Sequence, residues 1–102
     1  METTTTTTVD IATAANYEAN AVVEDLLKRD QGMFDSAEVL SVLDLVDTAI
    51  SLATDADPTK LSVLAEVAAA GRAKAGSQPL LDAAATKGGL LLDIWAGLES
   101  LR

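Results

Sequence analysis

The residues that could do metal chemistry are the carboxylates, and one stretch spaces them as a calcium-binding loop does. Positions 1, 3, 5 and 12 of the twelve-residue calcium-loop pattern are taken by Asp55, Asp57, Thr59 and Glu66. The sixth position, where that loop needs glycine for a sharp turn, is Lys60, and Pro58 stands where the loop should curl. An Asp-Pro pair is also a common helix start, so we interpret this stretch as the beginning of a helix and expect no metal.

Three further carboxylates lie within otherwise apolar stretches. Asp44 and Asp47 are three residues apart on one expected helix, and Asp93 lies on another. Carboxylate-bridged metal bundles add Glu-x-x-His motifs, and this chain contains no histidine. Paired-carboxylate hydrolysis would need a cleft and an acid with a raised pKa, and the sequence indicates neither. We therefore interpret these residues as a solvated edge.

Nucleophilic and cofactor chemistry find no support either. Tyr17 and the serines and threonines have no histidine to activate them, and there is no cysteine. The run Lys87-Gly88-Gly89 lacks the spaced glycines and the preceding strand of a phosphate-binding loop. The sequence predicts a protein that is not an enzyme, with no catalytic residue and no cofactor.

The charge of the chain disfavours some classes of binding partner. Sixteen acidic residues against seven basic ones give a formal charge of −9. Such a surface repels phosphate backbones and anionic lipids, so we expect no nucleic acid and no membrane as partner. The excess of Asp over Lys suits a protein made for concentrated salt, although a high-GC genome would give part of the same bias. We expect a cytoplasmic protein, or part of a particle assembled inside the cell.

The elements that position these residues are expected to be helices. Apolar residues make up 49% of 102 residues, with one Phe, one Tyr and one Trp, so a core of Leu, Val, Ile and Ala is required. This composition favours closely approaching helices over a β-sandwich. The predicted fold class is all-α, a four-helix up-and-down bundle of residues 9–102 behind a flexible threonine-rich tail of residues 1–8.

Helix boundaries follow from capping residues. The first helix is expected over about 10–30, and the second over 35–54, capped by Asp35 with Glu38 reaching back and Phe34 as a hydrophobic staple. The third is expected over about 58–75. The last is expected over about 79–101 as one helix, kinked at Gly88 if at all, because its apolar period keeps phase across the glycine pair. The first helix is expected to bury a stripe that begins at Ile11, and the last helix is expected to bury Leu80, Ala84, Leu91, Trp95 and Leu98.

The second helix is too apolar to be covered by one neighbour. A main stripe that includes Val39, Val42 and Val46 is widened to about half the circumference by Leu45, Ala49 and Leu52. Trp95 could be the wall of a ligand pocket or a membrane-edge anchor, but its phase with Leu91 and Leu98 favours a core or subunit-interface position. The predicted interface residues are Leu45, Ala49, Leu52, Leu91, Trp95 and Leu98.

The sequence therefore predicts a structural or adaptor protein that acts through helix-mediated association. Its partner would be a second copy of the chain or another protein, for example within a virion or other assembly. The alternative is a small regulatory or carrier module that binds an apolar ligand or a partner helix between its helices. Only the Gly88-Gly89 pair and the alanine-rich helix faces support that alternative.

Overall fold

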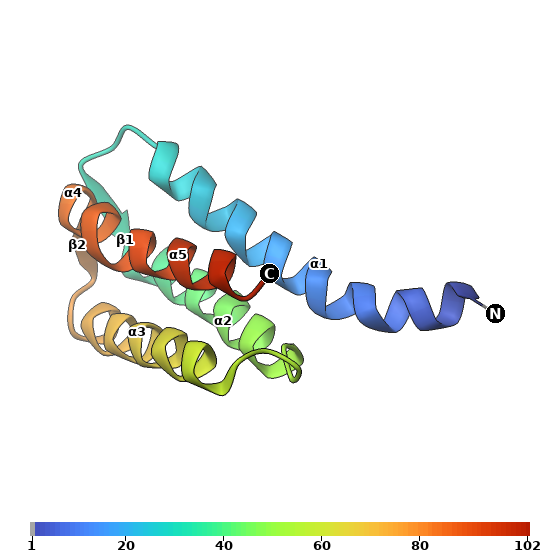
Figure 1. Ribbon diagram of the computed structural model, residues 1–102. Helices are drawn as coiled ribbons and strands as arrows, with labels where there is room; N and C mark the ends of the chain where they lie inside the picture. Colours follow the sequence, from blue (N-terminus) through green and yellow to red (C-terminus); the bar gives the residue numbers. More distant parts are fainter. Residues whose placement is uncertain (1) are drawn as a thin grey trace.

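The chain folds into four antiparallel helical rods. In the computed structural model, which describes the backbone of residues 2–102 and the side chains of residues 11–102, the order is α1 (Glu2–Lys28), β1 (Met33–Asp35), α2 (Ser36–Leu52), α3 (Pro58–Ser77), β2 (Leu80–Asp82), α4 (Ala83–Thr86), η1 (Lys87–Leu91) and α5 (Leu92–Ser100). The segments α4, η1 and α5 are continuous and form the fourth rod (Figure 1). Each rod packs against two neighbours in the cycle α1, α2, α3, α5. The predicted all-α four-helix bundle is confirmed.

α2 and α3 begin at the residues that their capping aspartates predict. Asp35 accepts a hydrogen bond from the Ala37 amide (2.9 Å), and Asp57 accepts one from the Thr59 amide (2.9 Å) with Pro58 in the first turn. The reciprocal half of the predicted capping box is wrong. The Glu38 carboxylate does not close back on the helix start but pairs with the Arg29 guanidinium.

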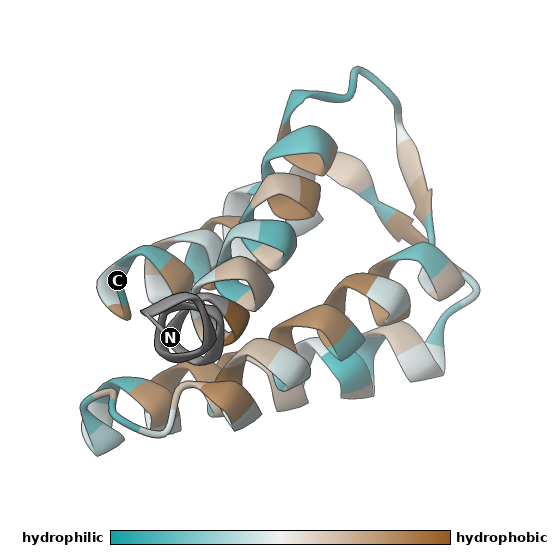
Figure 2. Cartoon of the chain, turned by 90° about the vertical axis from the view of Figure 1, so that its right-hand side faces the viewer, coloured by the Kyte–Doolittle hydropathy of each residue, from teal (hydrophilic) through white to brown (hydrophobic). Residues whose placement is uncertain are grey.

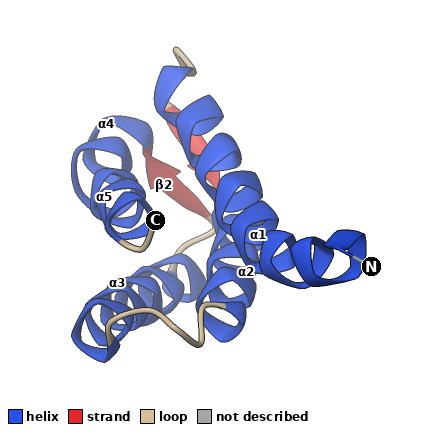
Figure 3. Ribbon diagram, turned by 45° about the vertical axis from the view of Figure 1, so that its right-hand side comes forward, coloured by secondary structure: helices blue, strands red, loops and turns tan. Residues whose placement is uncertain are grey.

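A two-stranded ladder was not predicted. β1 and β2 pair antiparallel at one end of the bundle, with Phe34 opposite Leu81 (Figure 3). Both of these side chains are buried, while their strand neighbours point outward. Leu80, which was expected on the buried stripe of the last helix, is therefore 52% exposed on the outer face of the ladder.

The fourth rod keeps its helical path through the glycine pair by widening one turn. η1 is a π-helical turn that contains Gly88 and Gly89, and the backbone on both sides stays in the right-handed helical region. Such a turn inserts one extra residue, so the buried side shifts phase by one position. The prediction of an unbroken helix over these glycines is confirmed, but the predicted constant phase is wrong: the buried residues are Ala83, Thr86, Leu91, Ile94 and Leu98.

The core is aliphatic, as the composition requires. Phe34 is its only buried aromatic residue among the described side chains, and the fully buried aliphatic residues include Leu26, Leu43, Leu64, Leu91, Ile94 and Leu98. Coloured by hydropathy, the helices carry apolar and polar segments side by side (Figure 2), as expected for rods that each bury one face. No helix in residues 2–102 is long and apolar enough to cross a membrane.

The first rod is longer than predicted. α1 has 27 residues against 17 in α2, and at 1.5 Å per residue its N-terminal part overhangs the bundle (Figure 1). The helical backbone reaches back to Glu2 through the threonine run, whereas a start near Asp10 was expected. Met1 and the side chains of residues 2–10 lie outside the described residues, so the flexibility of the 1–8 segment stays a prediction.

Candidate binding site

A hollow of about 720 Å³ lies at the end of the bundle opposite the β ladder. Its walls come from three parts of the chain that meet below the overhang of α1. They are α1 (Ile11, Ala12, Thr13, Asn16, Tyr17), the end of α2 with the following loop (Ser51, Leu52, Ala53, Thr54, Asp55, Ala56) and the final two residues (Leu101, Arg102). We call this set of residues the end hollow.

The end hollow gathers large apolar side chains that the bundle leaves in solvent. Ile11 is 53% exposed, Tyr17 is 52% exposed and Leu52 is 38% exposed. Ile11 was expected on the buried stripe of the first helix. That prediction is wrong, because Ala19 is the first residue of the predicted stripe that is fully buried, deeper in the bundle.

The floor of the end hollow is fixed by a polar network. Asn16 donates through Nδ2 to the Leu98 carbonyl oxygen (3.0 Å) and accepts through Oδ1 from Arg102 Nε (3.0 Å). The Arg102 guanidinium also lies over the Tyr17 ring, 3.9 Å from its centroid, a cation–π contact. Sequence reasoning missed these residues, because an asparagine on a helix gives no signal of what it faces.

Charge at the end hollow is balanced although the chain is strongly acidic. Its walls contain one acid, Asp55, and one base, Arg102. Elsewhere the basic residues are largely engaged within the chain. Arg72 pairs with Asp44 (3.1 Å) and Asp47 (2.5 Å), and these contacts raise its pKa above the ordinary value, chiefly through the hydrogen bond with Asp44.

The six predicted interface residues separate into three groups by burial. Ala49, Leu91 and Leu98 are buried in the chain's own core, where they are covered by the other helices. Leu45 and Trp95 are partly buried and pack against that core. Leu52 is exposed and lies in the wall of the end hollow. The second stripe of helix 2 is therefore mostly covered within the chain, and its free end is at the end hollow.

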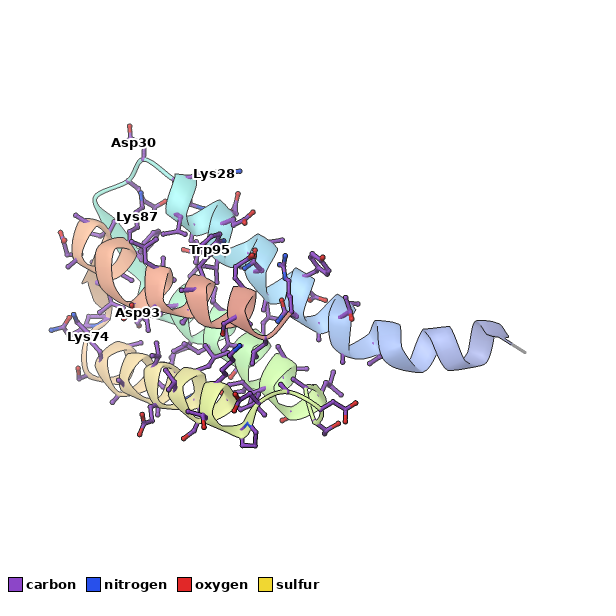
Figure 4. The ribbon with its side chains drawn as sticks, in the orientation of Figure 1. Lys28, Asp30, Lys74, Lys87, Asp93 and Trp95 are labelled. Atoms are coloured by element: carbon purple, nitrogen blue, oxygen red, sulfur yellow. The ribbon has the colours of Figure 1, made fainter. Side chains whose placement is uncertain are left out.

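Trp95 belongs to a polar contact between α5 and α1. Its Nε1 donates to a Glu24 carboxylate oxygen at 2.9 Å, and the ring lies between the two rods (Figure 4). Asn20, one turn before Glu24 on the same face of α1, is 3% exposed, and its Nδ2 has no hydrogen-bond partner. The contact between α1 and α5 thus mixes hydrogen bonds with one unpaired buried donor.

A second, smaller cavity of about 290 Å³ lies between α3 and the fourth rod. Four small residues, Ala70, Gly71, Ala85 and Gly89, form part of its walls. Lys74 and Asp93 border it from the two sides (Figure 4). We call it the α3 groove.

The carboxylates weighed as metal ligands are used in other ways. Asp57 is the N-cap of α3, and helix follows it without the curl of a calcium loop. Asp44 and Asp47 hold Arg72. Within the described side chains, no group of three or more His, Cys, Asp or Glu residues is placed to hold a metal ion.

Comparison of the chain with protein-family models, with curated proteins and with solved structures finds no significant match. Function therefore has to be inferred from the residues themselves.

Proposed function

We propose that this chain is a non-catalytic association module that self-associates through the end hollow. The observation that carries the proposal is the exposure of Ile11, Tyr17 and Leu52 around one concavity of about 720 Å³. Large apolar side chains scattered singly are normal on a protein surface, whereas a concentration of them in a hollow is typical of a contact site.

The balance of charge favours a second copy of the chain as the occupant. Two chains of charge −9 repel each other over most of their surfaces. The walls of the end hollow contain one acid and one base, so two copies that meet there bring fewer like charges together than at their acidic faces. A cationic partner would instead be drawn to the exposed acidic faces.

The length of α1 supports the same occupant. Its overhang extends past the bundle directly beside the end hollow (Figure 1). In a two-fold dimer each copy presents the same surface to the other, so the start of α1 in one copy would lie on the end hollow of its partner. Such an arrangement would bury the end hollow of each copy and provide the helix-mediated contact expected from the second stripe of α2.

Sedimentation velocity on a salt series tests this proposal. We expect a dimer or larger species at tens of micromolar protein, strengthened by added salt because screening weakens the repulsion between acidic chains. Ile11→Glu and Leu52→Glu should each return the protein to a monomer. Val63→Glu is the matched control, since Val63 is 54% exposed but lies outside the end hollow. A monomer throughout the salt series would end the proposal.

The α3 groove supports a second candidate, a small module that binds an apolar ligand. Its volume of about 290 Å³ is just below the usual range for ligand pockets, about 300–1,000 Å³, and its walls are largely apolar. The π-helical turn that borders it adds weight, since such turns often occur at functional sites. Native mass spectrometry tests this candidate: a retained small molecule that Ala85→Trp displaces would support it, and an unliganded protein that binds no added apolar probe would exclude it.

The cytoplasm, or a particle assembled inside the cell, is the proposed location, and halophilic adaptation is part of the same proposal.

A further inference from the structure

The two connections at the ladder end of the bundle are built alike. In each, a helix is followed by a short loop, a three-residue strand and a new helix capped by an aspartate. The caps are Asp35 and Asp82, and the central strand residues, Phe34 and Leu81, face each other across the ladder. Paired helix–loop–helix units joined by a short ladder are a way to bring two loops side by side.

The first connection has the length of a calcium-binding helix–loop–helix, with glycine and glutamate at two of its characteristic positions. In a twelve-residue calcium loop, side chains at positions 1, 3, 5 and 12 and the carbonyl at position 7 bind the ion, and position 6 is glycine. Counted from Leu27, position 6 is Gly32 and position 12 is Glu38. The strand covers positions 7–9 and the next helix starts at position 10. This window is distinct from the Asp55 window weighed from the sequence.

The remaining ligand positions have no anionic oxygen ligand. Positions 1, 3 and 5 are Leu27, Arg29 and Gln31, where a calcium loop has oxygen ligands. The Arg29 guanidinium pairs with the carboxylate of Glu38, the position-12 residue. Gln31 Nε2 donates to the Met33 carbonyl oxygen at 2.6 Å, which is the position-7 carbonyl. Two oxygens that would face an ion therefore face donors from the loop itself.

A second cation secures the loop from the other half of the bundle. Lys87, in η1, donates through Nζ to the Arg29 carbonyl oxygen, and its Nζ lies 6.0 Å from the centroid of the Phe34 ring. Figure 4 shows Lys87 beside this connection. The hydrogen bond with Glu38 raises the pKa of Arg29 above its ordinary value, so this side chain is a cation at neutral pH.

We propose that the connection from Leu27 to Glu38 is a metal-independent counterpart of a calcium loop, in which Arg29 and Gln31 supply the positive charge and the donors that the ion would supply. The helix pair α1 and α2 is then held in one arrangement without any divalent cation. Introducing oxygen ligands at positions 1, 3 and 5 should turn the connection into a calcium site.

The test is a triple variant, Leu27→Asp with Arg29→Asp and Gln31→Asp, measured by isothermal calorimetry and thermal unfolding with CaCl₂. The unmodified chain should give no binding heat and no change in melting temperature in millimolar CaCl₂. The triple variant should melt lower without calcium, because four carboxylates then crowd together, and regain melting temperature with calcium but less with MgCl₂.

A matched control separates site formation from a general response of acidic chains. Lys74→Asp with Gly76→Asp and Gln78→Asp places the same charges at positions 1, 3 and 5 of the second connection, where position 6 is Pro79 and position 12 is Ala85. This control changes the net charge by the same amount and should gain no calcium response. Equal responses in both variants, or calcium binding by the unmodified chain, would overturn the proposal.

A double-mutant cycle keeps the proposal testable if the triple variant does not fold. Arg29→Gln and Glu38→Gln should each lower the melting temperature, and the double variant should lower it by less than the two changes added together. Additive changes would show that Arg29 does not act on Glu38, and the internal cation would be rejected.

Discussion

Leu90 lies directly over Gly71, with its Cδ1 atom 2.5 Å from the point that a Cβ on Gly71 would occupy. The same relation recurs between α3 and α5, where Leu64 Cδ1 is 2.7 Å from the position that a Cβ on Gly97 would occupy. α3 and the fourth rod thus each place a leucine over a glycine of the other. The two glycines set how closely these rods approach, which explains why two poor helix formers lie within helices.

We expect Gly71→Ala to destabilise the protein despite the better helix propensity of alanine. Propensity favours Ala by about 1 kcal/mol, whereas overpacking typically costs about 1–3 kcal/mol because Leu90 has to leave its rotamer. Gly76→Ala is the control, since a Cβ there meets nothing within 4 Å, and it should stabilise by up to about 1 kcal/mol. Urea unfolding followed by circular dichroism measures both, and a Gly71→Ala protein as stable as the control would contradict the close approach.

The two buried asparagines of α1 should respond in opposite directions to replacement by leucine. Asn20→Leu removes an unpaired buried donor, so we expect a gain of about 1–2 kcal/mol in the free energy of unfolding. Asn16→Leu leaves the Leu98 carbonyl and Arg102 Nε without partners, so we expect a loss of similar size. Chemical unfolding of both variants gives the comparison, and the same sign for both would show that a bound water or another partner satisfies Asn20.

Asp82 caps the short α4, and its replacement measures what this cap contributes to stability. Its carboxylate accepts from the Ala85 amide at 2.9 Å, so Asp82→Ala should cost about 1 kcal/mol. Asp55→Ala removes the same charge from a loop residue that caps no helix and should change stability by a few tenths of a kcal/mol at most. Thermal unfolding at fixed ionic strength distinguishes the two, and equal losses would mean that charge rather than capping decides the result.

How far the sequence could predict this structure follows from the range of each signal. Caps such as Asp35 and Asp57 act on the next few residues, so the starts of α2 and α3 were found. The ladder was missed because three residues are too few to show alternation and their pairing is with a distant segment. The π-helical turn shifted the buried face of the last rod, so Ala84 is exposed, whereas Leu80 lies outside the helix, in β2.

The candidate sites depend on contacts that no single helix pattern contains. Half of the predicted interface residues are covered within the chain, because the other helices of the bundle pack over them. The end hollow needs Ile11, Leu52 and Arg102, which are far apart in the sequence and meet only when the bundle closes. Likewise, Gly32 and Glu38 match a calcium loop at only two positions, so the sequence did not indicate this window, and the contacts of Arg29 and Gln31 appear only in the structure.

Salt dependence of the fold is the last prediction. Arg72 joins α2 to α3 through Asp44 and Asp47, but these groups are largely exposed, with 40% of the Arg72 side chain accessible, so their attraction is weak. Repulsion among the remaining acids acts over a longer range and grows as salt is removed, since the Debye length reaches about 10 Å at 0.1 M. We therefore expect circular dichroism to show helix loss on dilution below about 0.1 M salt and a higher melting temperature in molar salt. Arg72→Gln should shift the loss of helix to higher salt, because it removes one of seven bases and leaves Asp44 and Asp47 without their cation. Helicity and melting temperature that do not change between low and molar salt would contradict a halophilic adaptation and leave the acidic surface to be explained by a cationic partner.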